Sequence, residues 1–142
     1  MTLTLADFKG RWHLSRQIFD DAQRVTGHFK GEAVFLPEGD GLRYVETGTL
    51  FMPGQTPMTA TQSYLWGADG GGNSGVIDVL FADGRAFHSI DLSADRATAD
   101  HHCAPDDYHV SYDFSRWPDW SSHWRVSGPR KAYELRNSFV HL

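Results

Sequence analysis

The sequence has a single cysteine, Cys103, among its 142 residues, so it cannot form an internal disulfide. One cysteine fits a reducing compartment, and we expect a cytoplasmic protein. The first residues lack a basic segment followed by an apolar run, which argues against a secretory signal peptide. No apolar stretch approaches the roughly 20 residues that cross a bilayer as a helix, so we predict no membrane span.

Positive charge is also scarce, because 13 Lys and Arg are set against 18 Asp and Glu, giving a formal net charge of -5. Nucleic-acid binding depends on cationic side chains that neutralise phosphates, so nucleic acid is not an expected partner. Aromatic residues, by contrast, make up 13% of the chain. Their flat rings pack well on pleated sheets and in pocket walls. With no internal repeat or linker, we predict one domain over residues 1–142.

Apolar and polar residues alternate from Gly10 onward, which is the period of half-buried antiparallel strands. Only residues 3–9 fit a helix, of one or two turns. Turn-rich segments such as 37–41 and 82–84, and an expected loop over 69–75, separate about ten strands at a spacing of roughly 8–12 residues. The expected strands are 11–19, 28–36, 42–51, 59–66, 76–81, 85–92, 98–103, 108–114, 120–126 and 132–141.

We predict an all-β fold, a closed antiparallel up-and-down barrel of about ten strands with a short N-terminal helix. The connections are short, as a meander requires. Polar residues also fall at inward positions, among them Arg16, Glu46 and His101, which a dry two-sheet core tolerates poorly. Closure removes exposed strand edges, so the barrel is favoured over the alternative, a sandwich.

Gly10-Arg11-Trp12 opens the first long strand, and the basic pair Arg130-Lys131 precedes the last. This arrangement resembles the calycin superfamily of lipocalins and fatty-acid-binding proteins, and more closely a bacterial family of lipocalin-like single-domain proteins. The resemblance implies a ligand-holding barrel but no activity. We expect Arg130 or Lys131 to cover Trp12 at the barrel base through a cation–π contact. The stretches that carry the closer resemblance are 27–33, 44–48, 64–66, 81–88, 101–108 and 128–133.

The densest polar group is His101, Cys103, Asp106 and Tyr108, around the expected turn at residues 104–105. It is compatible with a metal site, with a Cys–His nucleophile pair, or with polar anchors for a ligand. A small buried cysteine beside a hydrogen-bonded histidine is the structural alternative. The pattern that would complete a zinc ligand set is missing, so we predict no metal and no cofactor.

Haem is kept as an alternative because the chain has eight histidines. His88, His101 and His141 are the candidate axial ligands. His88 also raises a question of orientation, because Arg85 and Phe87 share one strand face and His88 lies on the other. The sequence leaves open which of the two faces points inward.

Arg16 and Glu46 both share a strand face with apolar neighbours, so both are expected inside the barrel. An unpaired buried charge is costly, which favours an ion pair between them. The planar guanidinium also suits a ligand carboxylate or phosphate. The sequence supports a structural ion pair and a ligand anchor equally.

We therefore predict a protein that binds a small, partly apolar and anionic ligand inside a barrel, with the oligomeric state open and a homodimer included. One alternative is an isomerase or hydrolase in the same cavity, with His101 as general base or Asp106 as acid. Another is a filled barrel that acts as an adaptor. The predicted ligand-binding residues are Arg16, Tyr44, Glu46, Tyr64, Trp66, Arg85, Phe87, His101, Cys103, Asp106, Tyr108 and Trp124.

Overall fold

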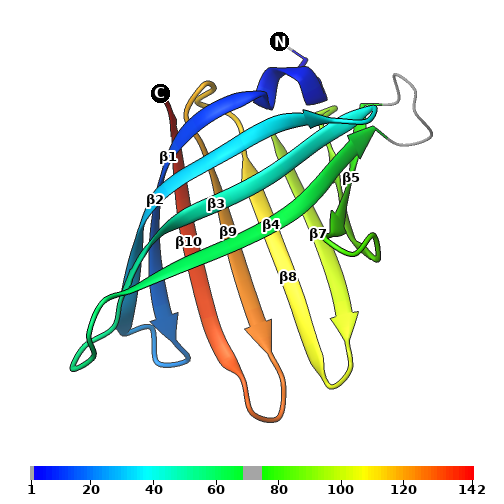
Figure 1. Ribbon diagram of the computed structural model, residues 1–142. Helices are drawn as coiled ribbons and strands as arrows, with labels where there is room; N and C mark the ends of the chain where they lie inside the picture. The colour runs from blue at the N-terminus through cyan, green and yellow to red at the C-terminus, as the bar shows by residue number, and fades with distance from the viewer. Residues whose placement is uncertain (1, 69–74) are drawn as a thin grey trace.

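The structure is a computed structural model that describes residues 2–68 and 75–142 (Figure 1). The predicted loop over 69–75 lies, apart from Gly75, outside these residues. A short 3-10 helix, η1 (Leu5–Phe8), precedes the sheet. The strands are β1 (Gly10–Asp20), β2 (Val25–Glu38), β3 (Gly41–Phe51), β4 (Met58–Ala68), β5 (Val76–Phe81), β6 (Ala86–Asp91), β7 (Arg96–Cys103), β8 (Asp106–Asp113), β9 (Trp120–Ser127) and β10 (Ala132–His141).

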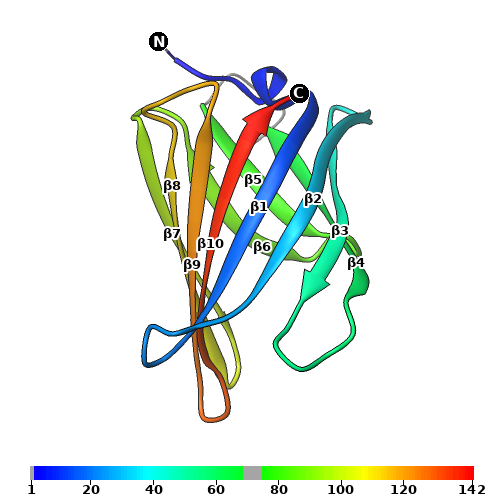
Figure 2. The same cartoon turned by 90° about the vertical axis from the view of Figure 1, so that its left-hand side faces the viewer.

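The strands form a single antiparallel sheet in the order β6-β5-β4-β3-β2-β1-β10-β9-β8-β7. Consecutive strands are paired except β6 and β7, and the first and last strands of the chain, β1 and β10, lie side by side (Figure 2). The sheet curls into a nearly closed barrel, in which β6 and β7 are the terminal strands of the described sheet. The predicted all-β, up-and-down barrel with a short N-terminal helical turn is thereby confirmed.

Local chemistry explains where the strands turn. Gly39 and Gly84 take positive φ angles of 56° and 92° in the β2–β3 and β5–β6 turns, a conformation that residues with a Cβ rarely adopt. The Asp20 carboxylate accepts backbone hydrogen bonds from Ala22 and Arg24 and so fixes the β1–β2 turn. These turns keep successive strands antiparallel and set the register, so that both side chains of every second cross-strand pair face inward.

One end of the barrel is sealed by η1 and aromatic side chains. Phe8 and Trp12 are both fully buried, and the Trp12 indole N–H donates a hydrogen bond to the Phe8 carbonyl oxygen at 2.9 Å. The Phe8 ring lies 5.3 Å from Trp66, 5.0 Å from Trp117 and 5.4 Å from Trp120, measured between ring centroids. The 3-10 turn therefore acts as a plug that packs between tryptophans.

The prediction that Arg130 or Lys131 covers Trp12 is wrong. Both residues lie in the β9–β10 turn, at the end of the barrel opposite η1 (Figure 1). Antiparallel pairing is the reason, because Trp12 is the register partner of His141 at the far end of β10. The His141 ring packs edge-on against the indole, with centroids 4.7 Å apart.

Candidate functional site

The barrel encloses a cavity of about 980 Å³ that reaches from the aromatic plug toward the opposite end. Trp66 and Trp120 line its closed end. The exposed residues that line it come from β4, from the β5–β6 turn and from the end of β7, so the mouth lies on that side of the barrel. They include Thr61, Gln62, Arg85, His102 and Cys103.

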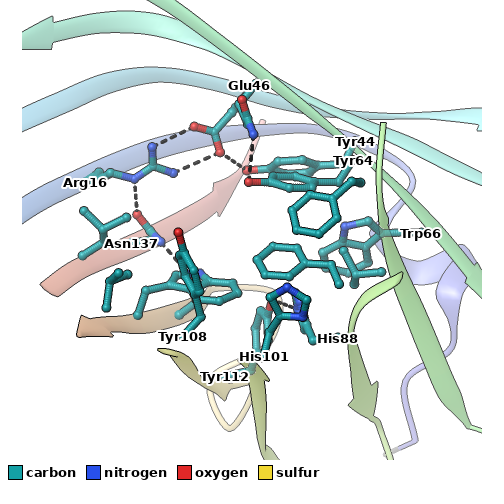
Figure 3. A pocket seen from close by; sticks show the side chains of 18 of the residues that line it. Arg16, Tyr44, Glu46, Tyr64, Trp66, His88, His101, Tyr108, Tyr112 and Asn137 are labelled. Atoms are coloured by element: carbon teal, nitrogen blue, oxygen red, sulfur yellow. Dashed lines mark hydrogen bonds and ion pairs between the residues drawn. The ribbon is translucent and has the colours of Figure 1, made fainter. Parts of the chain in front are cut away.

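A largely buried ion pair lies on the wall formed by β3, β2, β1 and β10 (Figure 3). Both terminal nitrogens of Arg16 donate to the Glu46 carboxylate, Nη1 to Oε2 at 2.8 Å and Nη2 to Oε1 at 3.0 Å. The Arg16 Nε donates to Asn137 Oδ1 at 2.6 Å, and the Asn137 amide donates to Ser122 Oγ at 2.9 Å. The Tyr44 hydroxyl adds a bond to Glu46 Oε1 at 2.7 Å.

Strand register explains this network. Arg16, Asn137 and Ser122 are cross-strand partners on β1, β10 and β9, so they stand abreast on the inner face. Phe29, the partner of Arg16 on β2, places its ring 5.1 Å from the guanidinium carbon. The guanidinium is thus held on three sides by neighbouring strands.

The charges of this network compensate each other. Burial acts to lower the pKa of Arg16, but the hydrogen bonds and the charge of Glu46 outweigh it, so the pKa lies above its ordinary value. Burial and the Glu46 carboxylate raise the pKa of Tyr44 well above its ordinary value, so its hydroxyl stays a hydrogen-bond donor. The wall therefore presents one positive and one negative charge that cancel each other, together with neutral hydroxyl and amide groups.

Flat aromatic rings form a second wall. Phe87 stacks between Phe81 and Trp124, with centroid distances of 4.4 Å and 5.2 Å and interplanar angles of 18° and 17°. The Tyr64 ring lies 5.6 Å from Phe87, and the His101 ring meets it edge-on at 5.2 Å. This wall offers apolar faces of the size of a planar ring.

His88 also lines the cavity, although strand alternation assigned it to the face opposite Phe87. His88 keeps its regular pairing with Val79, on the inward face that also carries Ile90. Phe87 has no partner between the His88–Val79 and Ala86–Leu80 pairs, and this β-bulge allows Phe87 to line the cavity as well. The His88 Nε2 lies 2.8 Å from the Tyr112 hydroxyl oxygen. Burial, with a smaller contribution from the charge of His101, lowers the pKa of His88 to about 4.

The predicted residues of β7 and β8 divide between the cavity and the surface. His101, Cys103 and Tyr108 line the cavity, with Cys103 exposed at its mouth. Asp106 is not among the described lining residues, and its carboxylate lies 3.2 Å from Lys131 Nζ instead. The structure therefore does not place Asp106 in the cavity as the predicted ligand contact or catalytic acid.

The same cavity is lined by the other predicted residues, which are Arg16, Tyr44, Glu46, Tyr64, Trp66, Arg85, Phe87 and Trp124. Arg85 lies at the mouth with 74% of its side chain exposed, where it pairs with Asp83 and covers the Phe81 ring. It is thus a rim residue and not part of the buried walls.

Residues 8–141 match the family model described as a family of unknown function (DUF6314). The chain belongs to this family. No protein with a curated description matches the sequence. The ten-strand barrel is compatible with a calycin-like fold, while the likeness to lipocalins remains a resemblance.

Two groups of this DUF6314 barrel were missed by the sequence reasoning. Asn137 lies on the inward face of β10 together with Leu135 and Phe139, and the spacing of two residues between them was visible in the sequence. The contact between His88 on β6 and Tyr112 on β8 was not predicted either, because these two strands are not neighbours in the sheet.

Residues 2–68 and 75–142 of this DUF6314 chain bear on metal binding and on membrane-spanning helices. Within these ranges, no three His, Cys, Asp or Glu side chains gather in a way that would hold a metal ion. No helix in the described chain has the length and apolar character needed to cross a membrane. Of the histidines considered for haem, His88 and His101 line the cavity, and His141 packs against Trp12 at the sealed end.

Proposed function

We propose that this protein binds a small, partly apolar molecule inside the barrel. The observation that carries the proposal is the cavity of about 980 Å³, which combines a stacked aromatic wall with a buried polar network. Ligand pockets typically have volumes of roughly 300–1,000 Å³ and few, fixed polar groups. A flat apolar part would lie against Phe87 and Trp124, and a polar end would reach Arg16.

The polar end is best matched by a neutral group. Glu46 compensates the charge of Arg16, so an anion would lie close to a carboxylate that repels it. Arg16 uses three of its N–H groups on Glu46 and Asn137, and the remaining donors are available to a carbonyl or hydroxyl oxygen. This revises the expectation of an anionic ligand. The single cysteine, exposed at the mouth, still favours a cytoplasmic location.

Native mass spectrometry of freshly purified protein tests the proposal first, and we expect an organic molecule of low mass to be retained. Calorimetry with 2-naphthamide and 2-naphthoate then compares a neutral and an anionic polar end on one ring system. We expect the amide to bind more tightly. Phe87→Leu should weaken binding several-fold because it removes the stacked face.

Arg16→Met is compared with Arg11→Met as the matched control. Arg11 pairs with Glu32 on the outer face of β1, so its loss should leave binding unchanged. The proposal fails when no molecule is retained and neither probe binds, or when Phe87→Leu and Arg16→Met both bind as wild type. Tighter binding of 2-naphthoate than of 2-naphthamide would instead support the sequence-based prediction of an anionic ligand.

A further inference from the structure

The β7–β8 hairpin presents two polar side chains, His101 and Tyr108, to the cavity. They are register partners, and their ring centroids lie 6.2 Å apart. The residues beside them along the two strands, Asp100 and His109, form an ion pair with each other at 2.7 Å on the outer face. Because side chains alternate between the two faces of a sheet, His101 and Tyr108 point inward, and both line the cavity.

Aromatic contacts hold these two rings in place. The Phe87 ring meets His101 edge-on with centroids 5.2 Å apart, and it meets Tyr108 edge-on at 6.3 Å. Phe81 makes a second edge contact with His101 at 5.6 Å. In Figure 3, His101 and Tyr108 lie on the opposite side of the view from Glu46. The stacked aromatic wall therefore carries two polar groups in fixed positions, and pockets use such groups to orient a ligand.

The polar atoms of His101 and Tyr108 are unpaired, and a molecule in the cavity can reach them. Within the described residues, neither the His101 ring nitrogens nor the Tyr108 hydroxyl makes a hydrogen bond. The unpaired polar atoms that are buried in this part of the chain are His88 Nδ1 and Trp120 Nε1. The polar atoms of His101 and Tyr108 are not among them, so they keep accessible surface, which faces the cavity because both side chains point inward.

This pair of residues favours a neutral group that both donates and accepts hydrogen bonds. Two cations beside this end of the cavity, Lys131 and Arg85, already pair with Asp106 and Asp83, so they offer a carboxylate no unpaired positive charge. A neutral imidazole has one donor and one acceptor nitrogen, and a tyrosine hydroxyl can also donate and accept. A hydroxyl group on the ligand matches both partners.

We propose that the ligand carries two neighbouring hydroxyl groups on its planar ring, one bonded to His101 and the other to Tyr108. The inference rests on the proposed function and adds the chemistry of a second polar end. No hydrogen bond joins His101 to Tyr108 within the described chain, so each residue offers a bond of its own. Hydroxyls on adjacent ring carbons lie side by side, as these register partners do. The flat ring would lie against Phe87, which contacts both residues.

Equilibrium dialysis with 2,3-dihydroxynaphthalene and 2,3-dimethylnaphthalene separates the hydrogen bonds from the ring contacts, because the two probes have nearly the same shape. Tyr108→Phe and His101→Phe each remove one polar partner and keep an aromatic ring. Each variant is expected to bind the diol about fivefold more weakly, the effect of one hydrogen bond, and the dimethyl probe within about twofold of wild type. His109→Phe, on the outer face of the same hairpin, is the matched control and should change neither affinity. Near-ultraviolet circular dichroism checks that the variants are folded.

The two probes distinguish failure of this inference from failure of the proposed function. If both variants bind the diol as tightly as wild type does, His101 and Tyr108 are only hydrated, and the diol site is refuted while cavity binding stands. Equal weakening of both probes would also overturn it, because the substitutions would then act on the shape of the cavity. Binding of the dimethyl probe alone to wild type has the same consequence. If neither probe binds wild type, the proposed function fails and this inference fails with it.

Discussion

Acidification is expected to destabilise this barrel through one buried side chain, His88. Its imidazole lies in the cavity wall beside Tyr112, and burial, together with the charge of His101, lowers its pKa to about 4 from an ordinary value of 6.5. In the unfolded chain the ring takes up a proton as soon as the pH falls below the ordinary value. The folded protein resists that proton until the pH is near 4.

The sign and size follow from proton linkage. Between pH 6.5 and about 4 the unfolded state binds more protons at His88 than the folded state, so stability falls as the pH falls. Each pH unit in this window costs about 1.4 kcal/mol. Between pH 7.5 and 4.5 the His88 contribution to the free energy of unfolding should therefore drop by roughly 2–3 kcal/mol.

Urea unfolding of wild type and His88→Gln at half-unit pH steps measures this contribution. Carboxylates also titrate at the acid end, but they do so in both proteins, so the difference between the two free energies isolates His88. We expect wild type to lose 2–3 kcal/mol more than the variant over this range. His13→Gln, at an exposed position on the outer face of β1, serves as the matched control and should follow wild type. A difference that stays constant from pH 7.5 to 4.5 would refute the reasoning.

Two further substitutions test the plug and the ion pair. Trp12→Ala should lower the free energy of unfolding by about 3–5 kcal/mol in urea titrations, because it removes a fully buried ring and its bond to Phe8, and an unchanged midpoint would remove Trp12 from the seal. Glu46→Gln should cost about 3–5 kcal/mol by the same assay, since it leaves a buried guanidinium without its counter-ion. Glu32→Gln, in the exposed pair on the outer face, should have little effect, and equal losses in the two Gln variants would contradict this account.

The strands were predictable because their signal is local. Inward and outward residues alternate from Trp12 to Ile18 in β1 and from Leu42 to Glu46 in β3, and glycine-containing turns flank β3. The inward positions of Arg16 and Glu46 follow from the same alternation. Their pairing needs only that β1 and β3 flank β2, as they do in a meander. The ion pair was therefore open to prediction before any coordinates.

Other features depend on geometry that alternation does not contain. The irregularity at Val79 and Leu80 leaves Phe87 without a partner in the β5–β6 register, so Phe87 and His88 both line the cavity although strict alternation places them on opposite faces. The predicted contact between Arg130 and Trp12 is wrong for a different reason. A strand of ten residues is roughly 33 Å long, so residues before β10 lie a full strand away from those that pair with its end. The direction of β10 therefore determines which of its residues lies near Trp12.

The two polar walls differ in how completely they are satisfied, and this difference bears on selectivity. On the β1 wall, Arg16 and Glu46 already bond to each other, so a ligand there gains little beyond added bonds to donors still open. On the opposite wall, the His88 Nδ1 atom has no hydrogen-bond partner within the described chain, but it has almost no accessible surface, so a molecule in the cavity does not reach it. A site rejects best those analogues that leave its buried polar groups unpaired. In the proposed binding mode, discrimination between ligands should therefore depend mainly on the N–H donors of Arg16 that Glu46 and Asn137 leave open.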